Sequence, residues 1–229
     1  MTQDHSRRII EALQADANLH YASEQALAEL ARHARLQDFD KGEYIFAAGD
    51  DSDHVYIVES GRVVLSKESP SGKVFTYLIA LRGMTLNGVT SFMARRIFSA
   101  RVAEQSTMVV IPDQVFRLWV LGQPEVASGI FNTMGELLNG AYARILDLID
   151  ESAENRILNA LNMLSSRVGA DLPLTNNDVA ELTGVSRETA ARVISNLQKL
   201  GLISKTRGSI RILDETQLKD LSTSPFFIL

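Results

Sequence analysis

Apolar and polar positions alternate in short runs through the first half of the chain. These runs are rich in β-branched and aromatic residues, lie roughly ten residues apart, and are separated by glycine-bearing turns such as Ser60-Gly61. The runs are Tyr44–Phe46, Val55–Val58, Val63–Leu65, Val74–Ile79 and Met108–Ile111. Short strands at regular intervals are typical of a β-sandwich or barrel, so we expect a β-rich domain here. Helical patterns near 5–15 and 23–34 precede it, and another from Pro112 to about Leu121 follows it.

The pattern then changes to helical spacing. Pro124 opens a segment, running to about Asp150, in which apolar residues recur at alternating intervals of three and four. The recurring residues are Phe131, Met134, Leu138, Ala141, Ile145 and Leu148. This heptad seam predicts a two-stranded coiled coil between two copies of the chain, and hence a homodimer. The alternative is a helix packed on its own domain through Ile130, Leu137 and Leu146.

Two short helices joined by a tight turn are predicted over residues 175–200. Thr175 is a suitable N-cap for the first helix, and Asp178 three residues later completes an approximate capping box. Gly184 ends that helix because a sharp turn needs a positive φ. Ser186 then caps the second helix. The apolar positions of the second helix are Ala190, Val193, Ile194 and Leu197.

Three charged residues near the start of the second helix fall outside its apolar positions: Arg187, Glu188 and Arg192. Arg can bind guanine through O6 and N7, and Glu can accept a hydrogen bond from cytosine N4. The alternative for Glu188 and Arg192 is a surface ion pair four residues apart. With the caps and the glycine turn, these residues favour a helix-turn-helix whose second helix reads the DNA major groove. Two such helices must lie about 34 Å apart to meet successive grooves, which again favours a homodimer.

A hairpin is predicted directly after the second helix. Gly201 ends that helix, and the β-prone runs Leu202–Ser204 and Ser209–Leu213 follow. Such a hairpin is the wing of a winged helix-turn-helix, and Lys205 and Arg207 near its tip are placed to contact DNA phosphates.

The distribution of charge agrees with a local DNA-binding surface. The whole chain has a formal net charge of −5, which argues against nonspecific coating of nucleic acid. Residues 186–211 nevertheless carry six basic side chains against one acidic side chain. A basic face on an acidic protein suits a specific DNA binder.

Composition and missing motifs exclude several other classes. With no Cys among 229 residues, the chain forms no disulfide and no cysteine-ligated iron–sulfur cluster. It has no nucleophile elbow, Gly-rich phosphate loop or metal-spaced His and Asp set, so we expect no enzyme, no catalytic residues and no metal site. No apolar run approaches the roughly 20 residues of a membrane span, and the start MTQDHSRRII lacks the apolar region of a signal peptide. We therefore expect a cytoplasmic protein with no membrane partner.

Two segments carry a resemblance to a known family. The segments KGEYIFAAGDDSDHVYIVESGRVVL and VSRETAARVISNLQKLGLI closely resemble the CRP/FNR (cAMP receptor/fumarate–nitrate) family of bacterial regulators, within a likeness running from about Leu36 to Leu213. The turn glycines that match are Gly42, Gly49, Gly61, Gly72 and Gly83. The resemblance implies an α+β fold. In it, 1–123 form a double-stranded β-roll effector domain with N-terminal helices, 124–151 a dimerisation helix, and 152–229 a winged helix-turn-helix domain.

The same resemblance implies roles for individual residues. Family members with Arg-Glu-Thr-x-x-Arg at this place use the first Arg, the Glu and the last Arg on base edges, which here are Arg187, Glu188 and Arg192. Ser186 and Thr189 would contact phosphates. The resemblance further implies double-stranded DNA with a two-fold symmetric, TGTGA-like site, and it makes RNA polymerase a candidate partner.

The effector region departs from the cyclic-nucleotide pattern. Nucleotide-binding members place a Glu for the ribose and, ten residues later, an Arg for the cyclic phosphate, where this chain has Gly88 and Phe98. Ser99 of the family pattern remains, and Ala141 and Tyr142 replace small hydroxyl residues that contact the adenine. A buried phosphate without its arginine lacks the charge-assisted bonds that offset desolvation. We therefore expect an allosteric effector other than cAMP.

The identity of that effector stays open. The expected pocket residues are Gly88, Val89, Phe92, Phe98, Ser99, Ala141 and Tyr142. They suit an apolar or aromatic small molecule, or Phe98 simply fills the space and no ligand is needed. Heme is a further alternative, with His33 on an N-terminal helix or His54 in a turn as its ligand. A cyclic-nucleotide-binding module with a non-DNA output is another alternative. The apolar end 222–229 packs on its own chain, docks across the dimer, or docks on the effector domain.

Overall fold

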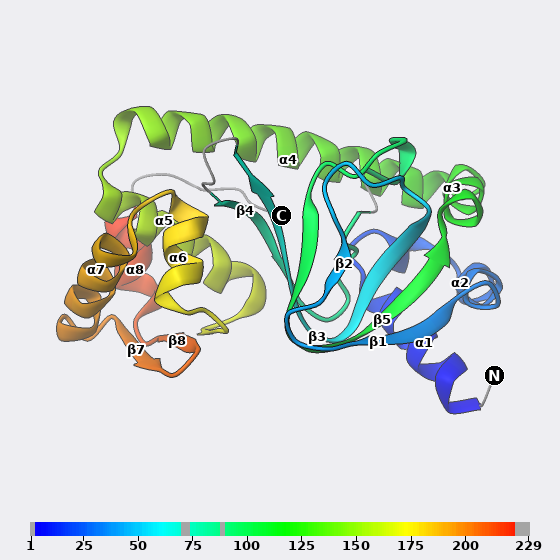
Figure 1. Cartoon of the computed structure of the whole chain (residues 1–229), viewed down its shortest axis with the longest axis horizontal. Helices are drawn as coiled ribbons and strands as arrows, with labels where there is room; N and C mark the ends of the chain where they lie inside the picture. The colour runs from blue at the N-terminus through cyan, green and yellow to red at the C-terminus, as the bar shows by residue number, and fades with distance from the viewer. Residues whose placement is uncertain (1–2, 70–73, 88–89, 223–229) are drawn as a thin grey trace. The chain divides into compact units, whose positions relative to one another are not determined.

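The computed structural model of the chain describes residues 3–69, 74–87 and 90–222. The chain divides into two compact units. The first consists of Met1–Lys73 and Tyr77–Gly135, and the second of Val74–Thr76 and Glu136–Leu229. Each unit has its own hydrophobic core, and the expected α+β class is confirmed (Figure 1).

The centre of the first unit is a β-roll. Its strands are β1 (Arg35–Phe39), β2 (Tyr44–Phe46), β3 (His54–Glu68), β4 (Val74–Ala80) and β5 (Ser99–Pro112). The first three residues of β4, Val74–Thr76, are assigned to the second unit. The strands form one sheet in the order β1-β5-β3-β4, with β2 also paired to β5. The antiparallel β3–β5 pair is the longest, and its register runs from His54 opposite Pro112 to Ser66 opposite Ser99. These two long strands contribute many of the buried side chains of the roll.

One sequence prediction about this sheet is wrong. We expected a turn at Ser60-Gly61 between two strands, but both residues lie inside β3. Gly61 has a φ of +90°, and the β3–β5 register shifts on both sides of it. A Cβ at this position would collide with Ser106 of β5. Gly61 therefore permits an irregularity within a continuous strand instead of ending it.

Helices pack on the roll and complete the core of the first unit. They are α1 (Gln3–Ala15), the 3₁₀ turn η1 (Leu19–Tyr21), α2 (Glu24–Ala31), the 3₁₀ turn η2 (Thr90–Phe92) and α3 (Asp113–Leu121). Their buried apolar side chains join those of β3 and β5 in one cluster that includes Ile9, Leu13, Leu27, Leu30, Val55, Ile57, Val109, Ile111 and Phe116. The prediction of a helix to residue 34 is wrong, because α2 ends at Ala31. His33 consequently lies in an exposed turn and not on a helix.

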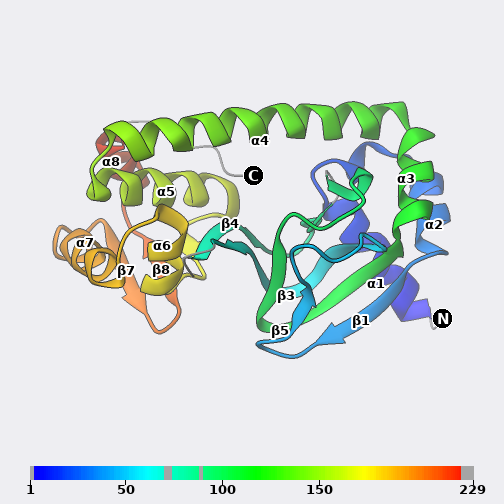
Figure 2. The ribbon, with the colours of Figure 1, turned by 45° about the horizontal axis from the view of Figure 1, so that its top comes forward.

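Helix α4 (Pro124–Asp150) is a single helix of 27 residues (Figure 2). Near its start, Val126 and Ile130 join the core of the first unit. Gly129 lies close to η1, where a Cβ would stand 3.1 Å from the Asn18 side-chain oxygen. One face of the first turns of α4 is therefore committed to its own chain.

The second unit contains a helix-turn-helix and a small sheet. Its elements are α5 (Ala153–Val168), β6 (Asp171–Leu172), α6 (Asn176–Thr183), α7 (Arg187–Lys199), β7 (Ile203–Thr206), β8 (Ser209–Ile212) and α8 (Glu215–Leu221). The three strands form a sheet in the order β6-β8-β7. The unit's core includes Ile157, Leu161, Val179, Leu182, Val193, Ile194, Leu197, Leu202, Ile210 and Leu218. Of the helices in the described parts of the chain, none is long and apolar enough to cross a membrane.

Candidate nucleic-acid interface and effector site

The first helix of the helix-turn-helix, α6, begins and ends as the sequence predicts. The Thr175 hydroxyl oxygen accepts a hydrogen bond from the Asp178 backbone N–H at 3.2 Å, and the Asp178 carboxylate accepts one from the Thr175 N–H at 2.7 Å. This is a complete capping box. At the other end, Gly184 has a φ of +68° and donates its N–H to the carbonyl of Ala180. The left-handed glycine reverses the chain and sends it into α7.

The second helix, α7, presents the predicted base readers to solvent. Its N-cap, Ser186, accepts a hydrogen bond from the Thr189 N–H at 3.1 Å, and its hydroxyl donates to the Thr189 hydroxyl at the same distance. Arg187, Glu188 and Arg192 are all exposed. The opposite face is buried through Ala190, Val193, Ile194 and Leu197. The helix is thus oriented by its apolar face, and its charged edge is available to a partner.

The surroundings of Glu188 favour the ionised form of its carboxyl, which accepts hydrogen bonds. Its own backbone N–H and the Ser186 hydroxyl lower the pKa of its carboxyl below the ordinary value, with a smaller contribution from Arg187. Among the residues that the structure describes, no ion pair joins Glu188 to Arg192, so the alternative of a surface pair gains no support. An ionised, exposed carboxylate at the start of a recognition helix suits a contact with cytosine N4.

The predicted wing is the hairpin of β7 and β8. Arg207 lies exposed in the turn between these strands. Lys205 is half-buried, and its ammonium donates a hydrogen bond to the side-chain oxygen of Asn176 at 2.7 Å. Arg211 on β8 forms an ion pair with Asp171 at 3.1 Å. Arg207 is therefore directed to solvent, whereas Lys205 also joins the wing to the first residue of α6.

The heptad seam on α4 is exposed. Phe131 has 72% of its surface accessible, and Leu138 has 54%. The other exposed members are Met134, Ala141 and Ile145, and the side chain of Leu148 lies outside the described residues. By contrast, Ile130 is buried and Leu137 is half-buried. The seam and the face committed to the first unit are therefore different faces of the same helix.

The expected effector residues fall into separate groups. Gly88 and Val89 lie outside the described residues, as do residues 223–229 of the apolar end. Phe92 is exposed, and the Ser99 hydroxyl accepts a hydrogen bond from the Ala48 N–H. Ala141 and Tyr142 are exposed on the part of α4 that belongs to the second unit.

Phe98 occupies a stacked position in the roll. Its ring lies on that of Tyr77, with centroids 4.2 Å apart and planes inclined by 7°. Burial raises the pKa of Tyr77 to about 12. This half-buried aromatic pair offers no cationic group to a phosphate at the place where the family pattern has an arginine.

Both arginines that precede Phe98 are already engaged by the roll. Arg96 is buried, donates to the carbonyl of His54 at 2.6 Å, and lies 3.2 Å from the Asp53 carboxylate. Its guanidinium also packs over the Phe46 ring at 4.4 Å. Arg95 donates to the carbonyl of Gly49 at 2.8 Å. These contacts join the 94–96 segment to the loop before β3.

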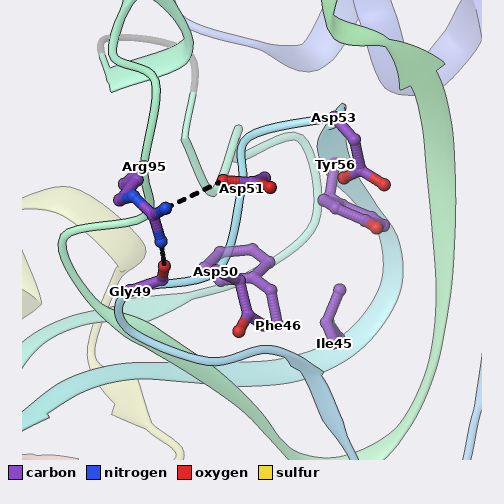
Figure 3. A pocket seen from close by; sticks show the side chains of 8 residues that line it. All are labelled: Ile45, Phe46, Gly49, Asp50, Asp51, Asp53, Tyr56 and Arg95. Carbon is purple, nitrogen blue, oxygen red and sulfur yellow. Dashed lines mark hydrogen bonds and ion pairs between the residues drawn. The ribbon is translucent and has the colours of Figure 1, made fainter.

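That loop borders a hollow that the sequence analysis missed (Figure 3). The hollow has a volume of about 670 Å³ and is lined by Ile45, Phe46, Gly49, Asp50, Asp51, Asp53, Tyr56 and Arg95. Of the expected effector residues that the structure describes, none lines it. In the sequence, the acid-rich stretch between Gly49 and His54 is a signal for this hollow, but the same stretch also indicates a turn. His54, the second candidate heme ligand, begins β3 with its Nδ1 3.0 Å from the Asp53 carboxylate.

A β-roll, a long helix with an exposed apolar seam, and a winged helix-turn-helix together define a DNA-binding protein with an attached roll domain. Comparison with protein families agrees with this class. Residues 36–120 match the model of the cyclic nucleotide-binding domain, and residues 155–221 match the Crp-like helix-turn-helix domain. The chain belongs to the CRP/FNR family, and it is a DNA-binding transcription regulator of that type.

Individual relatives cover most of the chain. A CRP-like cAMP-activated global transcriptional regulator of Mycobacterium tuberculosis is 26% identical over 204 residues, which are 84% of this chain and 90% of the relative. The anaerobic regulatory protein of Bacillus subtilis is 25% identical over 175 residues, 72% of this chain and 74% of the relative. The structure of FixK2 from Bradyrhizobium japonicum superposes with a TM-score of 0.75 at 19% identity, covering 83% of this chain and 98% of that one. At such identities the structural likeness concerns the fold.

Proposed function

We propose that the protein is a homodimeric, sequence-specific DNA-binding regulator whose recognition helix α7 reads a two-fold symmetric, TGTGA-like site. The observation that carries this proposal is the exposed edge of α7, where Arg187, Glu188 and Arg192 stand free of the apolar face. Arg suits guanine and an ionised Glu suits cytosine, so a half-site containing G and C follows. Ser186, Thr189, Lys205 and Arg207 would hold the phosphates around it.

The dimer in this proposal forms through α4. Its exposed apolar residues recur with the heptad spacing of a parallel coiled coil, and water contact with so many large apolar side chains is unfavourable. Burying this seam against a second copy would place two recognition helices on one duplex.

The proposal assigns the roll an effector other than cAMP. Phe98 is stacked on Tyr77, so an aromatic ring takes the place of the family's phosphate-binding arginine. The two neighbouring arginines already have acidic partners, since Arg96 pairs with Asp53 and Arg95 with Asp51, and neither is a free cationic partner for a phosphate. A phosphate buried without such a partner is strongly disfavoured. An effector would act by shifting the dimer between arrangements with misplaced and correctly spaced recognition helices.

Binding to duplexes selected from a random pool tests this function. We expect the purified protein to enrich a two-fold symmetric sequence containing G and C, and to bind it in fluorescence anisotropy with a steep loss of affinity as salt rises. Addition of cAMP should leave the affinity unchanged. Equal affinity for selected and scrambled duplexes would refute the DNA assignment, and a large cAMP-dependent gain would refute the effector assignment. An optical spectrum of the same sample with a heme band would show that heme is the effector.

A further inference from the structure

The wing is anchored unevenly along its length. At its base, Ile203, Ile210 and Ile212 are buried in the core of the second unit. Beyond them the hairpin carries only polar residues and a glycine, and Arg207 at the turn is exposed. Apolar packing therefore fixes where the wing begins, while polar contacts must fix the direction of its tip.

Two polar contacts secure the tip, one from each strand. On β8, the Ser209 hydroxyl donates to the carbonyl of Leu172 at 3.2 Å. On β7, the Lys205 ammonium donates to the Asn176 side-chain oxygen at 2.7 Å. The first contact stays within the small sheet. The second connects the wing to the helix-turn-helix itself, because Asn176 is the first residue of α6.

The chemistry of the second contact is suited to a surface that binds phosphate. Asn176 is neutral, so the hydrogen bond holds the Lys205 side chain without cancelling its charge. Arg211 on the neighbouring strand differs, because Asp171 pairs with it at 3.1 Å. An ammonium has three N–H donors, and one of them suffices for Asn176. The others can serve a phosphate oxygen beside the start of a helix, where the backbone dipole also favours an anion.

We propose that Asn176 is a positioning residue for DNA binding, which holds Lys205 against the start of α6 so that the wing and the helix-turn-helix meet the phosphate backbone as one surface. This inference rests on the proposed function. A lysine fixed before binding loses less conformational freedom when the complex forms, so the contact should strengthen binding without reading any base.

A double-mutant cycle with a salt titration tests the inference. Asn176→Ala, Lys205→Gln and the double variant are made in the full chain, and their affinities for the selected duplex are measured at several salt concentrations. Lys205→Gln should weaken binding by about three- to tenfold and flatten the slope of log K against log salt by about one. Asn176→Ala removes no charge, yet it should weaken binding several-fold and flatten the slope in the same direction. In the Lys205→Gln background, Asn176→Ala should have no further effect.

The neighbouring Asn177 provides the matched control. It also lies at the start of α6, but its amide donates to Glu181 at 2.6 Å and not to the wing. Asn177→Ala should have the same effect in both Lys205 backgrounds, and thermal unfolding should show that every variant is folded. The inference is overturned if Asn176→Ala leaves affinity and slope unchanged, or if its effect persists without Lys205. Failure of the unmodified protein to prefer any duplex would instead overturn the proposed function.

Discussion

At the scale of single residues, three exposed side chains at the start of α7 are the predicted base readers. Arg187, Glu188 and Arg192 are exposed because α7 buries its other face, and Ser186 fixes where the helix starts. The Glu188 N–H and the Ser186 hydroxyl lower the pKa of the Glu188 carboxyl, which favours its ionised, hydrogen-bond-accepting form. An ionised carboxylate accepts a hydrogen bond from cytosine N4 and so can contribute to discrimination between bases.

Replacement of the first arginine tests direct base reading. Arg187→Ala should cost about 1–3 kcal/mol on the selected duplex and relax the preference at one base-pair position. The measurement is a set of anisotropy titrations against duplexes that differ at single positions. Arg207→Ala, which removes a charge from the wing, should instead weaken binding to all these duplexes alike. Unchanged discrimination by Arg187→Ala would show that α7 does not read bases through this residue.

The lowered pKa of Glu188 leads to a prediction about pH. A carboxyl with a lowered pKa is ionised above that value and loses its charge only as the pH falls through it. The discrimination contributed by Glu188, measured as the difference between the protein and Glu188→Ala, should therefore be constant between about pH 5.5 and pH 8. A contribution that grows steadily across this interval would mean that the carboxyl is protonated near neutrality, contrary to its contacts.

At the scale of elements, two neighbouring arginines of α1 form ion pairs that differ in burial and in the element they reach. The Arg8 guanidinium on α1 bonds the carboxylate of Glu59, a buried residue of β3, with contacts of 3.1 and 2.7 Å. Arg7, one residue earlier, pairs with Glu11 on the surface of the same helix. The hydrogen bond from Arg8 holds the pKa of Glu59 below its ordinary value. Docking of α1 on the roll should therefore depend on Arg8 and not on Arg7.

Thermal unfolding of two matched variants checks this dependence. Arg8→Met should lower stability by about 1 kcal/mol at neutral pH, since Arg8 is partly solvated. Arg7→Met should change it very little. The stability from Glu59 is present above its unfolded pKa and disappears as the pH falls through the folded pKa, so the difference between the protein and Arg8→Met should shrink below about pH 4. If the stability difference between the protein and Arg8→Met stays the same at low pH, the loss of stability comes from packing of the Arg8 side chain and not from its ion pair.

In the proposed function, the exposed seam on α4 pairs two copies of the chain. Leu138→Glu should convert the dimer into a monomer in analytical ultracentrifugation and weaken binding to the two-fold symmetric duplex, because a charge would replace a buried apolar contact. Asn139→Glu places the same charge on the next, exposed residue and is the control. If both variants remain dimeric, the seam faces something other than a second copy.

Local signals in the sequence predicted some helix ends correctly, but they gave one wrong turn and missed two short elements. The caps at Thr175 and Ser186 and the glycine at 184 were confirmed because each has a strong, local chemical cause. The turn predicted at Ser60-Gly61 was wrong, because a glycine is common both in turns and at irregularities within strands. Only the contact of Gly61 with β5 distinguishes the two cases. The two-residue strand β6 and the helix α8 were not predicted, because their patterns are too short.

For the candidate sites too, the sequence predicted local patterns but not contacts between distant residues. The predicted base readers were visible as charged residues outside an apolar stripe, and the structure shows all three of them exposed. The contact between Lys205 and Asn176 was not visible, since 29 residues separate its partners. The hollow beside Arg95 likewise assembles residues from separate strands and loops. Sequence patterns reveal periodic faces, whereas contacts distant in sequence require the fold.

At the scale of the whole molecule, the central claim is that two copies read two half-sites on one duplex. This claim requires that the exposed seam on α4 pairs the two copies and that the exposed charged side chains of α7 contact the bases. A two-fold protein on DNA requires half-sites in a fixed helical phase, because each recognition helix must meet a major groove on the same side of the duplex.

Half-site phasing measures this claim most directly. The affinity of the full chain is determined for the selected duplex and for versions lengthened at the centre by about 5 and about 10 base pairs, a half and a full helical turn. If two copies bind one duplex, the half-turn insertion should reduce binding to the level of a single half-site, and removal of either half-site should do the same. Equal affinity for the selected, half-turn and single half-site duplexes would contradict the claim, because a protein that reads each half-site alone has no need of the dimer.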